Sequence, residues 1–327
     1  MHESRGRDAG PSAPISPSPH PPAAQACPDT FTKGSDLLFT GDYSFFDYKY
    51  DISGYTGQDF GGPAQYLYLA LSALLLAVLL WALRRAPERR VRQILRASGL
   101  LLTLLYLGKT AWESVFDLQR FGAFNTGLLP LDTCSLVMPA ALLAGWHRGR
   151  AGRMAACWLV TGGLVGGIGA MVRLNAFQYY PFCSFGACYS MLWHFWMVFL
   201  GLLLAVTDFC PREEEQSRAA RLLLGSARVR RGFAFHLLAS VPVIAVDYLF
   251  GFDFMLYREL GGVPFFESVG AGLIRAGLGL LNPLLMLALY LAAFRVAELL
   301  AEGARRLCCG RRQPAPGEMR RAAGIFR

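Results

Sequence analysis

Two side chains in this sequence form a candidate nucleophile and base. Cys134 lies in the segment LPLDTCSLVMPAALLAG, and His194 lies in the later segment YSMLWHFWMVFLGLLLAV. A cysteine thiolate attacks acyl carbonyl carbons, and an imidazole within hydrogen-bond reach can take the thiol proton. The pair therefore indicates acyl-transfer or ester-hydrolysis chemistry. Free cysteines also serve as small buried packing residues, and composition alone leaves that alternative open.

The residues around the pair predict how each side chain is presented. Pro130 is of a type favoured in the first turn of a helix, so we expect a regular helix to begin there, with Asp132 in its first turn and Cys134 just after it. The amide N–H groups and the positive end of that helix would favour a thiolate at Cys134. Asp132 is two residues from Cys134 and points to a different side, so its predicted role is orientation or capping. Ser190 and His194 are four residues apart and share a helix face.

Both segments belong to a set of seven apolar stretches, each close to the ~20 residues that a helix needs to cross the hydrocarbon core of a bilayer. These stretches lie at about 64–83, 94–114, 127–146, 154–172, 188–207, 233–250 and 269–296. The chain has 327 residues and a hydrophobic content of 54%, and its mean hydropathy is +0.34. The sequence therefore predicts an all-α fold, a polytopic seven-helix transmembrane bundle over residues 64–296, with no room for a separate soluble catalytic domain.

The arginines predict the direction of the spans. The connections after the first, third and fifth spans and the basic tail 297–327 are rich in arginine, whereas the connections after the second, fourth and sixth spans carry one arginine each. By the positive-inside rule, this alternation predicts an N-terminus outside and a C-terminus in the cytoplasm. The net charge of +9 is then explained by short loops that meet anionic lipid head groups. No nucleic-acid-binding motif accompanies these arginines, so we expect no nucleic-acid partner.

The predicted direction places further polar side chains at the same outer depth as Cys134 and His194. They are Lys109, Glu113, Asp132, Arg173, Asn175, Ser190, Asp247 and Arg275. Lys109 and Glu113 are four residues apart and can pair on one helix face. Ionisable residues in a membrane usually face the bundle interior and mark function, so this set predicts a polar pocket open to the non-cytoplasmic side. Ion pairs between helices and side chains that snorkel to the interface are the alternatives.

The deeper half of the bundle is expected to be apolar, apart from His236 near the cytoplasmic end of the sixth span. A polar mouth above a closed apolar floor describes a binding or catalytic cavity better than a transport path. No spacing of His, Cys and Asp resembles a zinc site, so we expect neither a metal nor another cofactor.

The extramembrane segments carry fewer signals. Residues 1–35 are rich in proline and serine and are predicted to be a disordered tail. Residues 36–63 are rich in aromatic and acidic residues, which fits either an interfacial flap or a plain linker. Cys183 and Cys188 could form a disulfide with each other or with Cys27, and their spacing does not decide the connectivity.

The two segments quoted first resemble the paired signatures of the YwaF-like bacterial integral membrane proteins and their eukaryotic relatives, the transmembrane protein 164 family. In that family one span begins with a Leu-Pro-x-x-x-Cys-like motif, and a later span carries a histidine amid apolar residues. The resemblance implies lipid acyltransferase chemistry, with Cys134 as the acyl-accepting nucleophile and His194 as the general base. It also implies membrane phospholipids as partners, and it covers the third to seventh spans.

Three classes of function are therefore compared. A phospholipid acyltransferase or ester hydrolase is the first, and the resemblance favours it. A non-enzymatic seven-span receptor or sensor for a lipid or small ligand is the alternative, although Tyr290 lies too far beyond Asn282 and Pro283 to complete the usual receptor motif. The apolar inner half argues against a transporter. The last span contains no lysine to form a retinal Schiff base.

Overall fold

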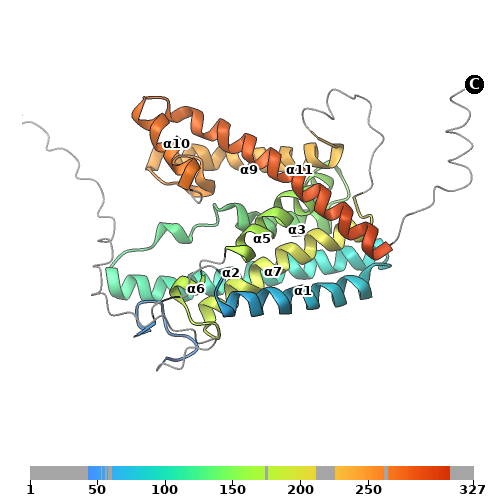
Figure 1. The fold of residues 1–327 in the computed structure, drawn as a ribbon, viewed down its shortest axis with the longest axis horizontal. Coiled ribbons are helices and arrows are strands. Elements are labelled where there is room, and N and C mark those ends of the chain that lie inside the picture. The colour runs from blue at the N-terminus through green and yellow to red at the C-terminus, as the bar shows by residue number, and fades with distance from the viewer. Residues whose placement is uncertain are drawn as a thin grey trace, which may run out of the picture. The chain divides into compact units, whose positions relative to one another are not determined.

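The computed structural model describes residues 43–52, 54–55, 57, 61–173, 176–210, 225–260 and 264–309. Every regular element in this part of the chain is a helix (Figure 1). Seven stretches are long and apolar enough to cross a membrane, which confirms the prediction of an all-α, seven-span fold. The predicted N-terminal tail 1–35 and the end of the basic tail, from 310 onward, lie outside the described residues.

Four of the seven spans are single helices, and a fifth, α11, is preceded by one short turn. The bounds are α1 Pro63–Leu83, α2 Glu88–Phe121, α7 Phe185–Val206, α9 Ala227–Phe250 and, after the 3₁₀ turn η5 Gly279–Leu281, α11 Asn282–Cys309. The third span, Thr126–Trp146, begins with two 3₁₀ turns before its α-helix, and the fourth, Arg150–Tyr179, contains a π-helical stretch. The elements of these two spans are η1 Thr126–Leu128, η2 Thr133–Leu136, α3 Val137–Trp146, α4 Arg150–Trp158, η3 Leu159–Gly163, α5 Leu164–Val172 and α6 Ala176–Tyr179.

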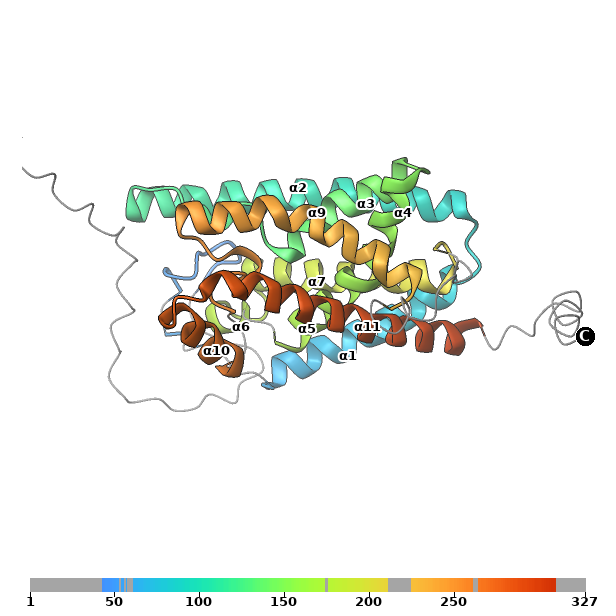
Figure 2. The ribbon, with the colours of Figure 1, turned by 90° about the horizontal axis from the view of Figure 1, so that it is seen from above.

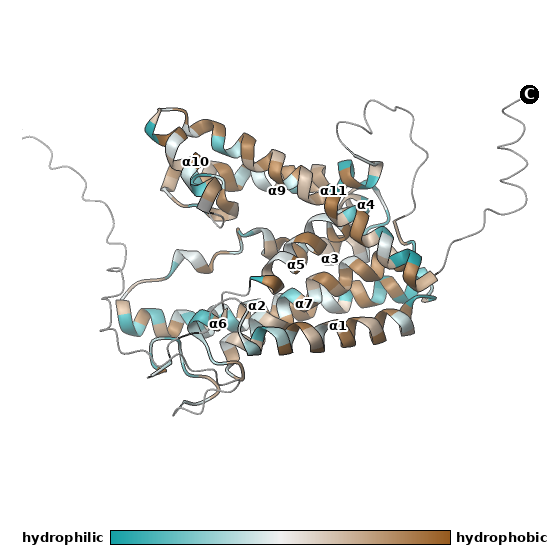
Figure 3. Ribbon diagram, viewed as in Figure 1, coloured by the Kyte–Doolittle hydropathy of each residue, from teal (hydrophilic) through white to brown (hydrophobic). Residues whose placement is uncertain are grey.

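The fourth and fifth spans form the core of the bundle. About two thirds of their apolar windows are buried, 67% and 61%, against 17% for α1 and for the last span. Helices α5 and α7 pack on each other, α4 packs on α9, and α11 lies against both α7 and α9. Figure 2 shows α2, α9, α11 and α1 running lengthwise around this core, and Figure 3 shows apolar residues along most of α1.

The last span begins later than its hydropathy predicts. The sequence places it at 269–296, but residues Pro264–Arg275 form a separate helix, α10, and the span covers Gly279–Cys309. Helix α10 ends because Gly277 adopts a left-handed conformation (φ 72°). The Gly277 N–H then donates to the carbonyl of Ile274 and the Leu278 N–H to that of Leu273, the hydrogen-bond pair of a Schellman motif.

Part of the segment before α1 packs against the bundle. Tyr48 is 1% exposed, and its hydroxyl donates to Asp117 of α2 at 2.8 Å. The Phe185 N–H at the start of α7 donates to the Phe45 carbonyl at 2.8 Å, and Arg120 pairs with Asp51 at 3.0 Å. The described residues of this segment therefore cover the end of the bundle where α2 ends and α7 begins.

Candidate functional site

A cavity of about 260 Å³ lies between α2, the start of the third span and α7. Its lining includes six of the residues singled out from the sequence: Lys109, Glu113, Asp132, Cys134, Ser190 and His194. These residues are contributed by three spans that are far apart in the sequence. The candidate nucleophile and the candidate base therefore share one cavity.

The position of His194 is fixed by its own helix. Its Nδ1 atom lies 2.8 Å from the backbone carbonyl oxygen of Ser190, one turn earlier on α7. A carbonyl oxygen only accepts hydrogen bonds, so Nδ1 carries the proton and Nε2 keeps its lone pair. The Ser190 hydroxyl lies farther from Nδ1, at 3.5 Å. The ring is therefore held in the tautomer that a general base needs.

Cys134 lies in a 3₁₀ turn and not in a regular helix. The prediction that the helix begins at Pro130 is wrong, because η2 spans Thr133–Leu136 and α3 begins only at Val137. Asp132 has extended backbone angles at the N-cap position of η2 and makes no side-chain capping bond. This break in helical geometry lets Asp132 and Cys134 line the same cavity, although they are two residues apart. The Met255 backbone lies near the Asp132 carboxylate.

The structure forms no hydrogen bond between the described side chains of Cys134 and His194. Both line the cavity and both are half-buried. Catalytic hydrogen bonds are often long in proteins without substrate and tighten when substrate binds.

A charged pair lies on the α2 side of the cavity. Lys109 Nζ is 2.5 Å from Glu113 Oε2, as their four-residue spacing predicts. Lys109 Nζ also lies 5.5 Å from the centre of the Tyr189 ring on α7. Lys109 is thus the one predicted cation that the structure places in the cavity lining among the described residues.

Three of the remaining predicted residues lie elsewhere, and one is not described. Arg173 is exposed at the end of α5, and Arg275 is exposed at the end of α10, so neither lines the cavity. Asp247 is fully buried and accepts a hydrogen bond from the Phe254 N–H at 2.9 Å, which holds the turn after α9. Asn175 lies outside the described residues. Arg275 was misplaced because hydropathy alone did not reveal the separate helix α10.

Aromatic residues complete the cavity wall. Tyr106, Tyr180, Tyr189 and Trp193 line it, and sequence analysis did not single them out. The rings of Tyr189 and Trp193 stack with centroids 5.4 Å apart. Burial raises the pKa of Tyr180, so its phenol stays protonated and able to donate a hydrogen bond. For Tyr189 and Trp193, the four-residue spacing places both side chains on one helix face, next to the face that carries Ser190 and His194.

A second polar cluster lies behind the cavity, around the fully buried His236 of α9. The Tyr257 hydroxyl is 3.1 Å from His236 Nε2 and 2.5 Å from Ser240 Oγ. The Ser240 hydroxyl donates to the His236 carbonyl at 2.8 Å. The Tyr290 ring of α11 lies beside the His236 ring at an interplanar angle of 56°, with centroids 4.2 Å apart. The Tyr290 hydroxyl lies 2.7 Å from Thr133 Oγ1. The cluster thus reaches the residue that precedes Cys134.

The sequence pattern of the TMEM164 family matches residues 60–269. The match covers about two thirds of the chain and includes every residue of the cavity lining. The chain belongs to the TMEM164 family. No curated protein and no solved structure matches it. Family membership and the seven apolar helices identify this TMEM164-family chain as an integral membrane protein that contacts membrane lipids.

Proposed function

We propose that this TMEM164-family protein is a membrane acyltransferase that moves acyl chains between phospholipids through a thioester on Cys134. The observation that carries the proposal is the single cavity lined by Cys134 and by His194 in its Nδ1–H tautomer. A thiol and a pre-oriented imidazole in one cavity are the minimal parts of nucleophilic acyl transfer. Water in place of a lipid acceptor would give ester hydrolysis by the same residues.

The first half of the reaction loads the cysteine. His194 Nε2 takes the proton from the Cys134 thiol, and the sulfur attacks the carbonyl carbon of a phospholipid ester. The tetrahedral intermediate collapses, the C–O bond to glycerol breaks, and the leaving alkoxide takes the proton back from the His194 imidazolium. The products are a lysophospholipid and an acyl-thioester on Cys134.

The second half of the reaction transfers the acyl chain from Cys134 to an acceptor. His194 Nε2 takes a proton from the hydroxyl of an acceptor lysophospholipid, whose oxygen attacks the thioester carbonyl. The C–S bond breaks and the thiolate recovers the proton from His194. No electrons are gained or lost, so the cycle needs no redox partner.

The cavity also supports a way of holding the substrate. Its volume of about 260 Å³ is too small for a whole phospholipid, so the ester and part of the head group enter while the acyl chains stay in the bilayer. The Lys109 ammonium meets the lipid phosphate, since the neighbouring Glu113 carboxylate holds it at the cavity wall. We propose that the cavity opens to the non-cytoplasmic side, as the distribution of arginines predicts.

The thioester is the direct test. Purified protein is incubated with phospholipids that carry an isotope-labelled acyl chain, and peptides are examined for the adduct by mass spectrometry. We expect an adduct on Cys134 in wild type and in Cys183→Ala, which removes an exposed thiol outside the cavity. We expect no adduct and no acyl transfer in Cys134→Ala. Absence of both adduct and transfer in folded wild-type protein, across all phospholipid classes, would overturn the acyltransferase proposal and leave a lipid-binding sensor as the better hypothesis.

A further inference from the structure

The opposite end of the bundle carries two adjoining cavities lined by arginines. The first has a volume of about 420 Å³ and lies between α4 and α9; it is lined by Arg150, Arg153, Met154, Ala227, Arg230, Arg231 and Ala234. The second has about 180 Å³ and shares Arg153 and Arg231 with the first. Neither shares a residue with the cavity of Cys134 and His194. We call the pair of cavities the arginine cleft.

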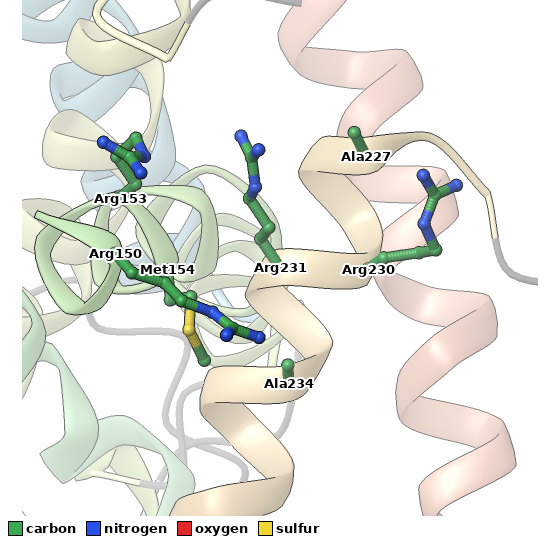
Figure 4. A pocket seen from close by; sticks show the side chains of 7 residues that line it. All are labelled: Arg150, Arg153, Met154, Ala227, Arg230, Arg231 and Ala234. Atoms are coloured by element: carbon green, nitrogen blue, oxygen red, sulfur yellow. The ribbon is translucent and has the colours of Figure 1, made fainter. Parts of the chain in front are cut away.

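The helix packing brings these arginines together. Helices α4 and α9 approach so closely at Gly232 that an added Cβ atom would lie 2.4 Å from Thr161 Oγ1 and 3.0 Å from the Cys157 carbonyl oxygen. Figure 4 shows Arg150 extending from α4 toward α9, and Arg230 pointing away from α4. The Arg230 side chain also donates to the Gly225 carbonyl at 2.9 Å, and Arg150 and Arg153 are the principal cations of the larger cavity.

One arginine of the smaller cavity is buried and incompletely satisfied. Arg228 is 5% exposed, and one of its terminal nitrogens donates to the Cys210 carbonyl at 2.6 Å. Its Nε atom is buried without a hydrogen-bond partner. A buried donor without an acceptor destabilises the folded protein. An anion oxygen in the cavity would relieve that destabilisation.

Four arginines of the arginine cleft have no carboxylate partner among the described residues: Arg148, Arg150, Arg153 and Arg228. Among the described residues, the two linings hold seven arginines: Arg92, Arg148, Arg150, Arg153, Arg228, Arg230 and Arg231. They hold a single carboxylate, Glu88, which is already paired with Arg92 at 2.7 Å. Guanidinium groups match phosphate in both charge and hydrogen-bond geometry. Two adjoining cavities that hold these four arginines suit a ligand that carries more than one phosphate.

We propose that the arginine cleft binds a polyanion with at least two phosphate groups. Two sources share that chemistry: the head group of a polyphosphoinositide in the bilayer, and a soluble inositol phosphate. The cleft lies at the arginine-rich end of the spans, which the sequence predicts to be cytoplasmic, and basic pockets between helices at that level bind phosphorylated lipid head groups. The arginines at this end of the bundle would then bind a ligand in addition to fixing the direction of the spans.

Binding by the intact protein tests the proposal. The full-length chain in phosphatidylcholine nanodiscs is titrated with a short-chain phosphatidylinositol bisphosphate, with inositol trisphosphate and with short-chain phosphatidylserine. We expect the bisphosphate lipid to bind more tightly than phosphatidylserine. Arg150→Gln combined with Arg153→Gln should weaken that binding by at least about tenfold, since both substitutions lose charge-assisted hydrogen bonds to phosphate.

The control variant combines Arg89→Gln with Arg90→Gln. These arginines are exposed on α2 at the same end of the bundle and line neither cavity. The control changes charge equally, and we expect it to alter the affinity by less than about twofold. Arg150→Lys combined with Arg153→Lys keeps the charge and should lose part of the affinity, because lysine lacks the planar fork.

The outcomes separate the sources and decide the proposal. Competition by inositol trisphosphate at equal affinity supports the site and assigns it a soluble ligand, whereas binding of the lipid without such competition supports the site and assigns it a membrane ligand. Equal losses in the cleft variant and the control variant would show diffuse charge attraction and would overturn the proposal. Failure of folded wild-type protein to bind any of these phosphate ligands would overturn it as well.

Discussion

Two histidines lie in transmembrane helices of this protein, and their hydrogen bonds place them in opposite tautomers. His194 donates from Nδ1 to the Ser190 carbonyl, so the lone pair of Nε2 remains available at the cavity. His236 belongs to a closed ring of bonds: Ser240 donates to the His236 carbonyl, so it accepts from Tyr257, which in turn accepts from His236 Nε2–H. The comparison shows that the neighbours of a membrane histidine decide which ring nitrogen carries the proton.

Among changes at the two histidines and their hydrogen-bond partners, replacement of His194 is expected to reduce acyl transfer most. Replacing it with glutamine (His194→Gln) keeps a donor for the Ser190 carbonyl but removes the base. Since general base catalysis contributes about 10²–10⁴-fold, we expect acyl transfer to fall by that factor while the melting temperature stays near that of wild type. Transfer of a labelled acyl chain and thermal unfolding in detergent measure the two quantities.

The corresponding change at His236 is the control. His236→Gln should lower the melting temperature but leave transfer per folded molecule within a few fold of wild type. Equal loss of transfer in the two variants, at equal amounts of folded protein, would contradict the assignment of chemistry to His194 alone.

A smaller effect is expected from the ring of bonds around His236. In Tyr257→Phe, the buried Nε2–H of His236 loses its acceptor and Ser240 loses its donor. We expect a loss of about 1–3 kcal/mol in the free energy of unfolding, because a buried donor is left unpaired. Reversible denaturation in mixed micelles measures this change.

A matched variant is available on an exposed tyrosine. Tyr248 donates to the Gly279 carbonyl from an exposed position, so Tyr248→Phe should cost less than Tyr257→Phe. An equal loss in the free energy of unfolding in the two variants would show that the ring of bonds stabilises the fold no more than an exposed hydrogen bond does.

A change at Ser190 tests which group orients the His194 ring, and it is expected to alter acyl transfer only slightly. The Ser190 hydroxyl lies 3.5 Å from His194 Nδ1, whereas the Ser190 carbonyl lies at 2.8 Å. Ser190→Ala removes only the longer contact, so we expect acyl transfer to change by less than about threefold, since a bond beyond the usual range contributes little. A loss as large as that of His194→Gln would show that the hydroxyl, and not the carbonyl, orients the ring.

Much of the fold and part of the site could be predicted from the sequence, for reasons visible in particular residues. Hydropathy placed α1 and α7 to within a few residues, because continuous apolar runs of this length have few other uses. The four-residue spacings of Lys109 with Glu113 and of Ser190 with His194 gave correct neighbours, because helix geometry alone sets them.

The wrong predictions concern features that local sequence does not specify. Arg275 and Asp247 were assigned to the pocket by depth, but depth does not specify which way a side chain points. The helix start at Pro130 was missed by several residues because 3₁₀ turns and α-helices share the same favoured residue types near their ends. The ring of hydrogen bonds around His236 joins residues from α9 and the turn after it, and no local sequence pattern predicts it.

Local composition was enough to predict seven membrane-spanning helices and the places where arginines gather, because hydrophobic length and charge are properties of single segments. The packing between helices was needed to establish that Cys134 and His194 line one cavity, that Arg173 and Arg275 do not, and that two arginine-lined cavities adjoin between α4 and α9. Those outcomes depend on how far each helix is rotated about its axis and where each begins. Both are set by close packing between spans distant in the chain.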